Sequence, residues 1–109
     1  MARALVVYSK RFFCPDVGQA RMVIDHLGVA YREIHIEDDP QAAAKVLAWT
    51  GHYSCPTIVV AEEGSVDPAG PVEPLLPGRS PRGIDRGHLI TEPNPKQLRD
   101  FLIKHGFVE

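Results

Sequence analysis

The hydrophobic and polar positions of the chain predict four short strands. Residues 4–8 form a continuous apolar run rich in β-forming residues, which is typical of a strand buried on both faces. Residues 31–36 alternate apolar and polar side chains, the period of a strand with one wetter face. Residues 56–61 indicate a third strand and residues 88–91 a short fourth one. The run at 4–8 is therefore expected near the centre of a sheet.

Three helices are predicted between and after these strands. The first begins at Pro15 and ends near Gly28, the second runs from Asp39-Pro40 to Gly51, and the third runs from Asn94-Pro95 to Gly106. Each has proline at its first helical position, where no backbone N–H is needed, and glycine where a left-handed residue ends a helix. Apolar residues recur every three or four positions within each helix, so each has one buried face.

The predicted order is β-α-β-α-β-β-α, within a single domain covering residues 1–109. Such an order at this length predicts an α/β fold with a four-stranded mixed sheet and helices on both faces. Residues 62–87 break the pattern, with five prolines and five glycines and little periodicity. We expect this segment to be an irregular excursion, because long coil in a compact domain is uncommon and is often functional or disordered.

The composition of the chain indicates which classes of protein it can belong to. With 109 residues, 44% hydrophobic and 24% charged, the chain suits one compact domain. Its formal charge of -2 and the lack of a basic block predict no binding to nucleic acid or membranes. No apolar run is long enough to span a bilayer or to form a signal peptide, so a cytoplasmic location is expected. Two cysteines are too few for a disulfide framework.

Cys14 is the main candidate for chemistry, because it follows the first predicted strand and directly precedes a helix that begins at Pro15. A helix N-terminus carries partial positive charge and unpaired N–H groups, which favour a thiolate. Lys10 and Arg11 add positive potential, whereas Asp16 in the first helical turn opposes it. A free cysteine is often just a small buried apolar residue, but this position favours a reactive thiol.

Several motifs, in this order, resemble those of the glutaredoxin family. They are the Val-Val-Tyr-Ser-Lys-x-x-x-Cys-Pro run at 6–15, the segments at 28–36 and 39–40, and Cys-Pro-Thr-Ile-Val at 55–59. The resemblance implies a thioredoxin-like fold and a cis peptide bond before Pro56, which would lie beside the reactive cysteine and bind thiol substrates through its backbone. It implies a substrate-binding set of Lys10, Phe13, Pro15, Cys55 and Pro56.

The chain departs from the family pattern at three points. Val17 stands where dithiol members have a second cysteine, so the motif Cys14-Pro-Asp-Val17 has no resolving thiol of its own. Cys55 replaces an aliphatic residue and is a second catalytic candidate: it can pair with Cys14 if their Cα atoms lie within about 7 Å, share a metal or cluster with it, or pack as a neutral thiol. A Gly-Gly-Asp signature for glutathione is absent.

Other candidate residues have simpler interpretations. His52 and Tyr53 precede the Cys-Pro motif and are expected to be surface groups that border the site. Arg21 is expected to be a solvated charge and Trp49 a core residue. The other histidines show no zinc-ligand spacing with either cysteine, so no metal site is predicted; these residues are His26, His35, His88 and His105.

These observations together predict a monothiol-type thiol–disulfide oxidoreductase acting through the Cys14 thiolate. No cofactor is required, and glutathione or another low-molecular-weight thiol is the expected co-substrate. The expected partners are a small thiol or a disulfide-containing protein. Two alternatives from other classes are an iron–sulfur cluster carrier and a non-catalytic binding module that uses residues 62–87 to contact a protein. Neither the oligomeric state nor the physiological substrate follows from the sequence.

Overall fold

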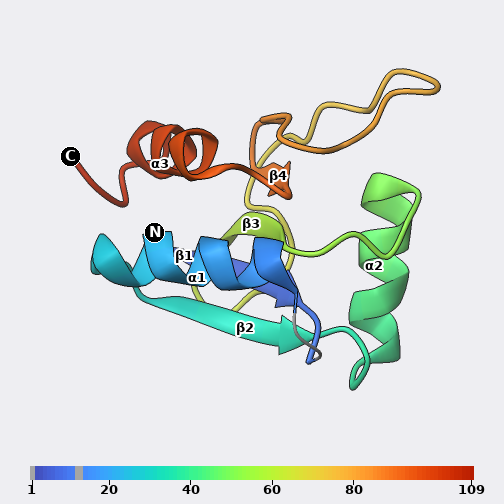
Figure 1. Ribbon diagram of the computed structural model, residues 1–109, viewed down its shortest axis with the longest axis horizontal. Coiled ribbons are helices and arrows are strands. Elements are labelled where there is room, and N and C mark those ends of the chain that lie inside the picture. Colours follow the sequence, from blue (N-terminus) through green and yellow to red (C-terminus); the bar gives the residue numbers. More distant parts are fainter. Residues whose placement is uncertain (1, 12–13) are drawn as a thin grey trace.

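The computed structural model describes residues 2–11 and 14–109 and contains a four-stranded sheet with three helices (Figure 1). The elements follow the predicted order of strands and helices. In chain order they are β1 (Arg3–Ser9), α1 (Pro15–His26), β2 (Tyr31–His35), α2 (Pro40–Thr50), β3 (Thr57–Glu62), β4 (Leu89–Thr91) and α3 (Pro95–Lys104).

The sheet has the strand order β2-β1-β3-β4 and is mixed. β1 pairs in parallel with β2 and antiparallel with β3, while β4 pairs antiparallel with β3. β1 is thus an inner strand, which explains why residues 5–9 are all buried. The prediction of an α/β, thioredoxin-like fold with a mixed sheet is confirmed.

Helices cover both faces of the sheet, and each face has its own apolar core. Alternate residues of β1 separate the two, with Leu5 and Val7 on one side and Val6 and Tyr8 on the other. α1 and α3 cover the first face, through residues such as Ile24 and Phe101. α2 covers the second. The second face also holds Cys55, with Cys14 packed against its cluster.

Local signals set the helix ends much as predicted. Asp39 accepts hydrogen bonds from two amides in the first turn of α2, and Asn94 forms a capping box with Gln97 at the start of α3. α2 ends at Gly51, whose φ of 80° is the left-handed conformation that glycine adopts without strain. α1 ends at His26 with Leu27 as its C-cap, and the next residue is Gly28, whose φ of 71° is the left-handed conformation expected of the predicted stop.

The excursion at residues 62–87 leaves β3, extends beyond the sheet at the end where α2 lies, and returns to β4 (Figure 1). It lacks regular elements, but isolated bridges tie it to the domain, including Ala61 with Pro68 and Asp85 with Ile90. Arg86 is 6% exposed and donates hydrogen bonds to the carbonyl oxygens of Trp49 (2.6 Å) and Glu73 (2.8 Å). Backbone pairing and one buried arginine therefore hold the base of the excursion.

None of the helices in the described part of the chain is both long and apolar enough to cross a lipid bilayer.

Candidate functional site

Cys14 is the residue that precedes α1, with an extended backbone (φ -140°, ψ 116°). Its carbonyl oxygen accepts the first helical hydrogen bond, from the N–H of Gly18 at 3.0 Å, and its side chain makes no capping bond. The residue is half-buried, and Pro15 begins the helix at an exposed position. The thiol therefore lies at the positive end of the helix with part of its surface open to solvent.

The segment before β3 lies beside this thiol. The Cys55–Pro56 peptide bond is cis, and both residues are buried. The Cys14 thiol donates to the carbonyl oxygen of Cys55, with Sγ and O 3.9 Å apart. The fold thus brings together two positions 41 residues apart in the chain, and both cysteines are free thiols.

Cys55 differs from Cys14 in its surroundings. Its side chain belongs to the apolar core, and only 4% of the residue is exposed. Burial raises the pKa of the Cys55 thiol to about 12, against the opposing effect of the positive charge of Lys10. Cys55 therefore carries a neutral thiol near pH 7, the form that is a poor nucleophile.

The remaining predicted substrate-binding residues have different settings. Lys10 follows β1 and is half-buried, and its charge acts on the Cys55 thiol. Pro56 is buried, and its carbonyl oxygen accepts a hydrogen bond from the N–H of Glu92 at 2.8 Å. Phe13 lies outside the described residues. The structure thus gathers Lys10, Pro56 and both cysteines at one end of the sheet.

An arginine that the sequence did not single out lies next to this site. The guanidinium of Arg82 donates to both carboxylate oxygens of Asp16, at 3.0 and 3.1 Å, and also to the carboxylate of Glu92. These partners raise the pKa of Arg82, with the Asp16 hydrogen bond as the largest cause. Asp16, which the sequence predicts to oppose a thiolate at Cys14, is thus paired with a cation that it shares with Glu92, and this pairing reduces its effect on the thiol.

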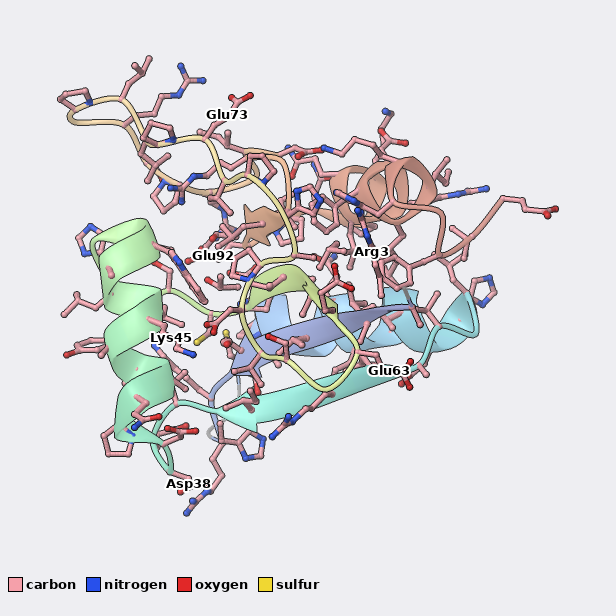
Figure 2. The ribbon with its side chains drawn as sticks, turned by 180° about the vertical axis from the view of Figure 1, so that it is seen from behind. Arg3, Asp38, Lys45, Glu63, Glu73 and Glu92 are labelled. Carbon is pink, nitrogen blue, oxygen red and sulfur yellow. The ribbon has the colours of Figure 1, made fainter. Side chains whose placement is uncertain are left out.

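Glu92 connects this arginine to the cis-proline loop. It directly follows β4 in the chain and is labelled in Figure 2. Its φ of 46° is unusual for a residue other than glycine, and its backbone N–H binds the Pro56 carbonyl. Glu92 thus links the excursion, which its carboxylate contacts through Arg82, to the cis-proline segment, which its backbone N–H contacts. No local sequence signal marks this link, because Arg82 and Asp16 are 66 residues apart.

A polar pocket of about 550 Å³ opens beside the Cys55–Pro56 segment. One wall consists of His52 and Ser54, and the opposite wall consists of residues 78–81 from the excursion, with Glu92 completing the lining. His52 and Tyr53 are exposed. The excursion therefore contributes a wall to a pocket that begins one residue before Cys55.

Two further residues named from the sequence have settings away from this pocket. Arg21, expected to be a solvated charge, is partly exposed and forms an ion pair with Glu33, whose carboxylate also accepts from Ser9 and contacts His35. These bonds hold the pKa of Glu33 at about 2, with the Arg21 hydrogen bond as the main cause. Trp49 is half-buried and packs edge-on against Tyr8, with ring centroids 5.3 Å apart.

Among residues 2–11 and 14–109, no three His, Cys, Asp or Glu side chains are grouped so that they could hold a metal ion.

Comparison with known proteins identifies the family. The model of the glutaredoxin family matches residues 5–64, more than half of the chain. The match runs from β1 past the end of β3 and includes Cys14, Cys55 and the cis-proline. Most of the excursion, β4 and α3 follow it. Comparison with individual curated proteins finds no significant match. The chain belongs to the glutaredoxin family.

Proposed function

We propose that this protein is a thiol–disulfide oxidoreductase of the monothiol type, with Cys14 as its nucleophile. Membership of the glutaredoxin family indicates thiol–disulfide chemistry in general. The observation that carries the finer proposal is the position of the Cys14 sulfur, at the N-terminus of α1 and 3.9 Å from the carbonyl oxygen before a cis-proline. This position combines a helix end that favours a thiolate with backbone groups that can align a substrate.

The proposed reaction has three exchange steps, two at Cys14 and one between external thiols. In the first, the Cys14 thiolate attacks one sulfur of a substrate disulfide, forming a mixed disulfide with the enzyme and releasing the other half as a thiolate. In the second, a low-molecular-weight thiol attacks this mixed disulfide and restores the Cys14 thiolate. A further molecule of that thiol then releases the remaining group, so two external thiols are oxidised to one disulfide and supply the two electrons that reduce the substrate.

The external thiol is the preferred resolving group because of the setting of Cys55. A thiol with a pKa of about 12 is almost entirely protonated at neutral pH, and the Cys55 side chain is enclosed by apolar residues. Attack by Cys55 on a disulfide at Cys14 would require both a proton acceptor and exposure. Resolution by Cys55 stays a prediction of the sequence, and the burial of its thiol argues against it.

The neighbouring groups have supporting roles in this proposal. Lys10 attracts a carboxylate of the substrate, and the backbone around Pro56 aligns the disulfide for attack. Pro15 begins α1 at a position where no backbone N–H is needed. Phe13 is expected to contact the substrate.

The test replaces each cysteine separately. We expect Cys14→Ser to abolish turnover of a small neutral disulfide, such as bis(2-hydroxyethyl) disulfide, in the presence of excess external thiol. Cys55→Ala serves as the matched control and should retain turnover. Full activity in Cys14→Ser would overturn the proposal. Loss of turnover in a folded Cys55→Ala protein would show that Cys55, rather than the external thiol, resolves the intermediate.

A further inference from the structure

The excursion is held in a defined place beside the site. The N–H of Gly83 donates to the carbonyl oxygen of Thr91 at 2.7 Å, next to the Arg82 contacts with Asp16 and Glu92. Pro81 is buried. Residues 82 and 83 therefore lie against the end of β4 and anchor the pocket wall that precedes them in the chain, residues 78–81.

A second pocket, of about 240 Å³, adjoins the polar one, and Arg79 lines both. Its lining includes the apolar side chains of Leu75, Leu76 and Ile84, and Leu76 is 66% exposed. From Ser54, next to Cys55, a continuous surface thus passes the polar pocket, then Arg79, then a second pocket of the excursion in which these apolar side chains lie beside charged ones.

Two arginines along this surface, Arg79 and Arg86, are not paired with a carboxylate among the described residues. Among residues 2–11 and 14–109, the Arg79 side chain has no hydrogen-bond or ion-pair partner. Arg86, which also lines the second pocket, is buried and bonded to carbonyl oxygens, without a carboxylate partner among the described residues. Glu73 is the acidic residue of this pocket (Figure 2). In the polar pocket, Glu92 shares the guanidinium of Arg82 with Asp16.

We propose that the excursion at residues 62–87 is a docking arm for a protein substrate, with Arg79 binding a carboxylate near the substrate's disulfide and Leu75, Leu76 and Ile84 receiving an apolar side chain. This inference rests on the proposed function, since the docked segment presents its disulfide to Cys14. A planar guanidinium suits a carboxylate because it can donate two parallel hydrogen bonds. The two adjoining pockets fit an extended peptide, whose side chains along the segment can enter both.

The experiment uses synthetic peptides that carry one cysteine in a mixed disulfide with 2-mercaptoethanol. In one series a glutamate is placed at successive positions on either side of the cysteine, with a leucine beyond it. Matched peptides replace the glutamate with glutamine or lysine. We expect the wild-type protein to reduce the best glutamate peptide with a kcat/KM about tenfold above that of its glutamine counterpart.

Two variants test Arg79 directly, and a third serves as their control. Arg79→Ala should remove the preference for glutamate without changing turnover of bis(2-hydroxyethyl) disulfide. Arg79→Glu should reverse the preference toward the lysine peptide. Arg99→Ala is the matched control, because it removes an exposed arginine on α3, away from the two pockets, and should behave as wild type.

Two readouts separate this inference from the proposed function. Turnover of the small disulfide that depends on Cys14, with no glutamate preference at any position, would overturn the docking arm and leave the proposed function in place. Absence of all turnover would overturn the proposed function. Docking is then decided by fluorescence anisotropy with labelled peptides that carry serine for cysteine. If Arg79→Ala weakens binding of the glutamate peptide about tenfold, the docking arm is supported. If all peptides bind equally well, the docking arm is overturned.

Discussion

Arg82 binds both carboxylate oxygens of Asp16, and this contact joins the excursion to the first turn of the helix that begins after Cys14. A carboxylate in this turn would disfavour a nearby thiolate by charge repulsion. We therefore predict that Arg82→Ala lowers the alkylation rate constant of Cys14 at neutral pH by about two- to fivefold, the range for a partly exposed charge near a helix end. Iodoacetamide kinetics measured at low and high salt would check this, with a smaller effect expected at high salt.

A double substitution tests whether Arg82 acts on Cys14 through the charge of Asp16 or through the position of the helix. Asp16→Asn in the Arg82→Ala background should return the alkylation rate toward that of the wild type, because the uncovered charge is gone. Arg82→Lys should keep most of the rate, since it retains the cation. A rate that stays low in the double variant would contradict the electrostatic explanation.

The Glu33 carboxylate should stabilise the fold in a pH-dependent way. Its folded-state pKa of about 2 lies below the ordinary value, so its contribution is present above about pH 4.5 and is lost as the pH falls through 2. We expect Glu33→Gln to lower the free energy of unfolding at pH 7 by about 1–3 kcal/mol, because Arg21 and Ser9 lose a charged partner. Urea denaturation at pH 7 and near pH 2 should show this difference shrinking. An equal difference at both pH values would contradict the prediction.

Cys55 should affect stability in the alkaline range. Its folded-state pKa is raised to about 12, so the protonated thiol favours the folded state fully below the ordinary pKa of 9.0, and this contribution is lost as the pH rises toward 12. We expect the melting temperature of the wild-type protein to fall more steeply between pH 8 and pH 10 than that of Cys55→Ala. Parallel curves for the two proteins would show that the thiol titrates alike in both states.

Arg86 should hold the base of the excursion against the rest of the domain. Arg86→Met removes the donors to the Trp49 and Glu73 carbonyl oxygens, and leaving such acceptors unpaired costs about 1–3 kcal/mol. Trypsin should then cleave faster after Arg79, which lies in the excursion. Arg99→Ala provides a control that leaves the excursion untouched. Unchanged cleavage in Arg86→Met would mean that the backbone bridges alone hold the segment.

The order of elements and the helix ends could be predicted from the chain because each depends on neighbouring residues, and the mixed sheet was inferred from that order. The run at 4–8 predicted a buried strand and became the inner strand β1. Asp39 and Asn94 cap the helices that they were expected to begin. The position of Cys14 at a helix start could also be predicted locally. Pro15 and the apolar residues that recur after it mark the beginning of a helix, and Cys14 directly precedes them.

The surroundings of Cys14 depended instead on contacts between distant parts of the chain. The excursion has no periodicity, so nothing in its residues indicated that Arg82 would bind Asp16 or that Arg79 would line a pocket near Ser54. The burial of Cys55, and with it the pKa of its thiol, likewise depends on which helix covers that face of the sheet. Charge and solvation at a site act through space, and the path of the folded chain determines which groups lie within reach.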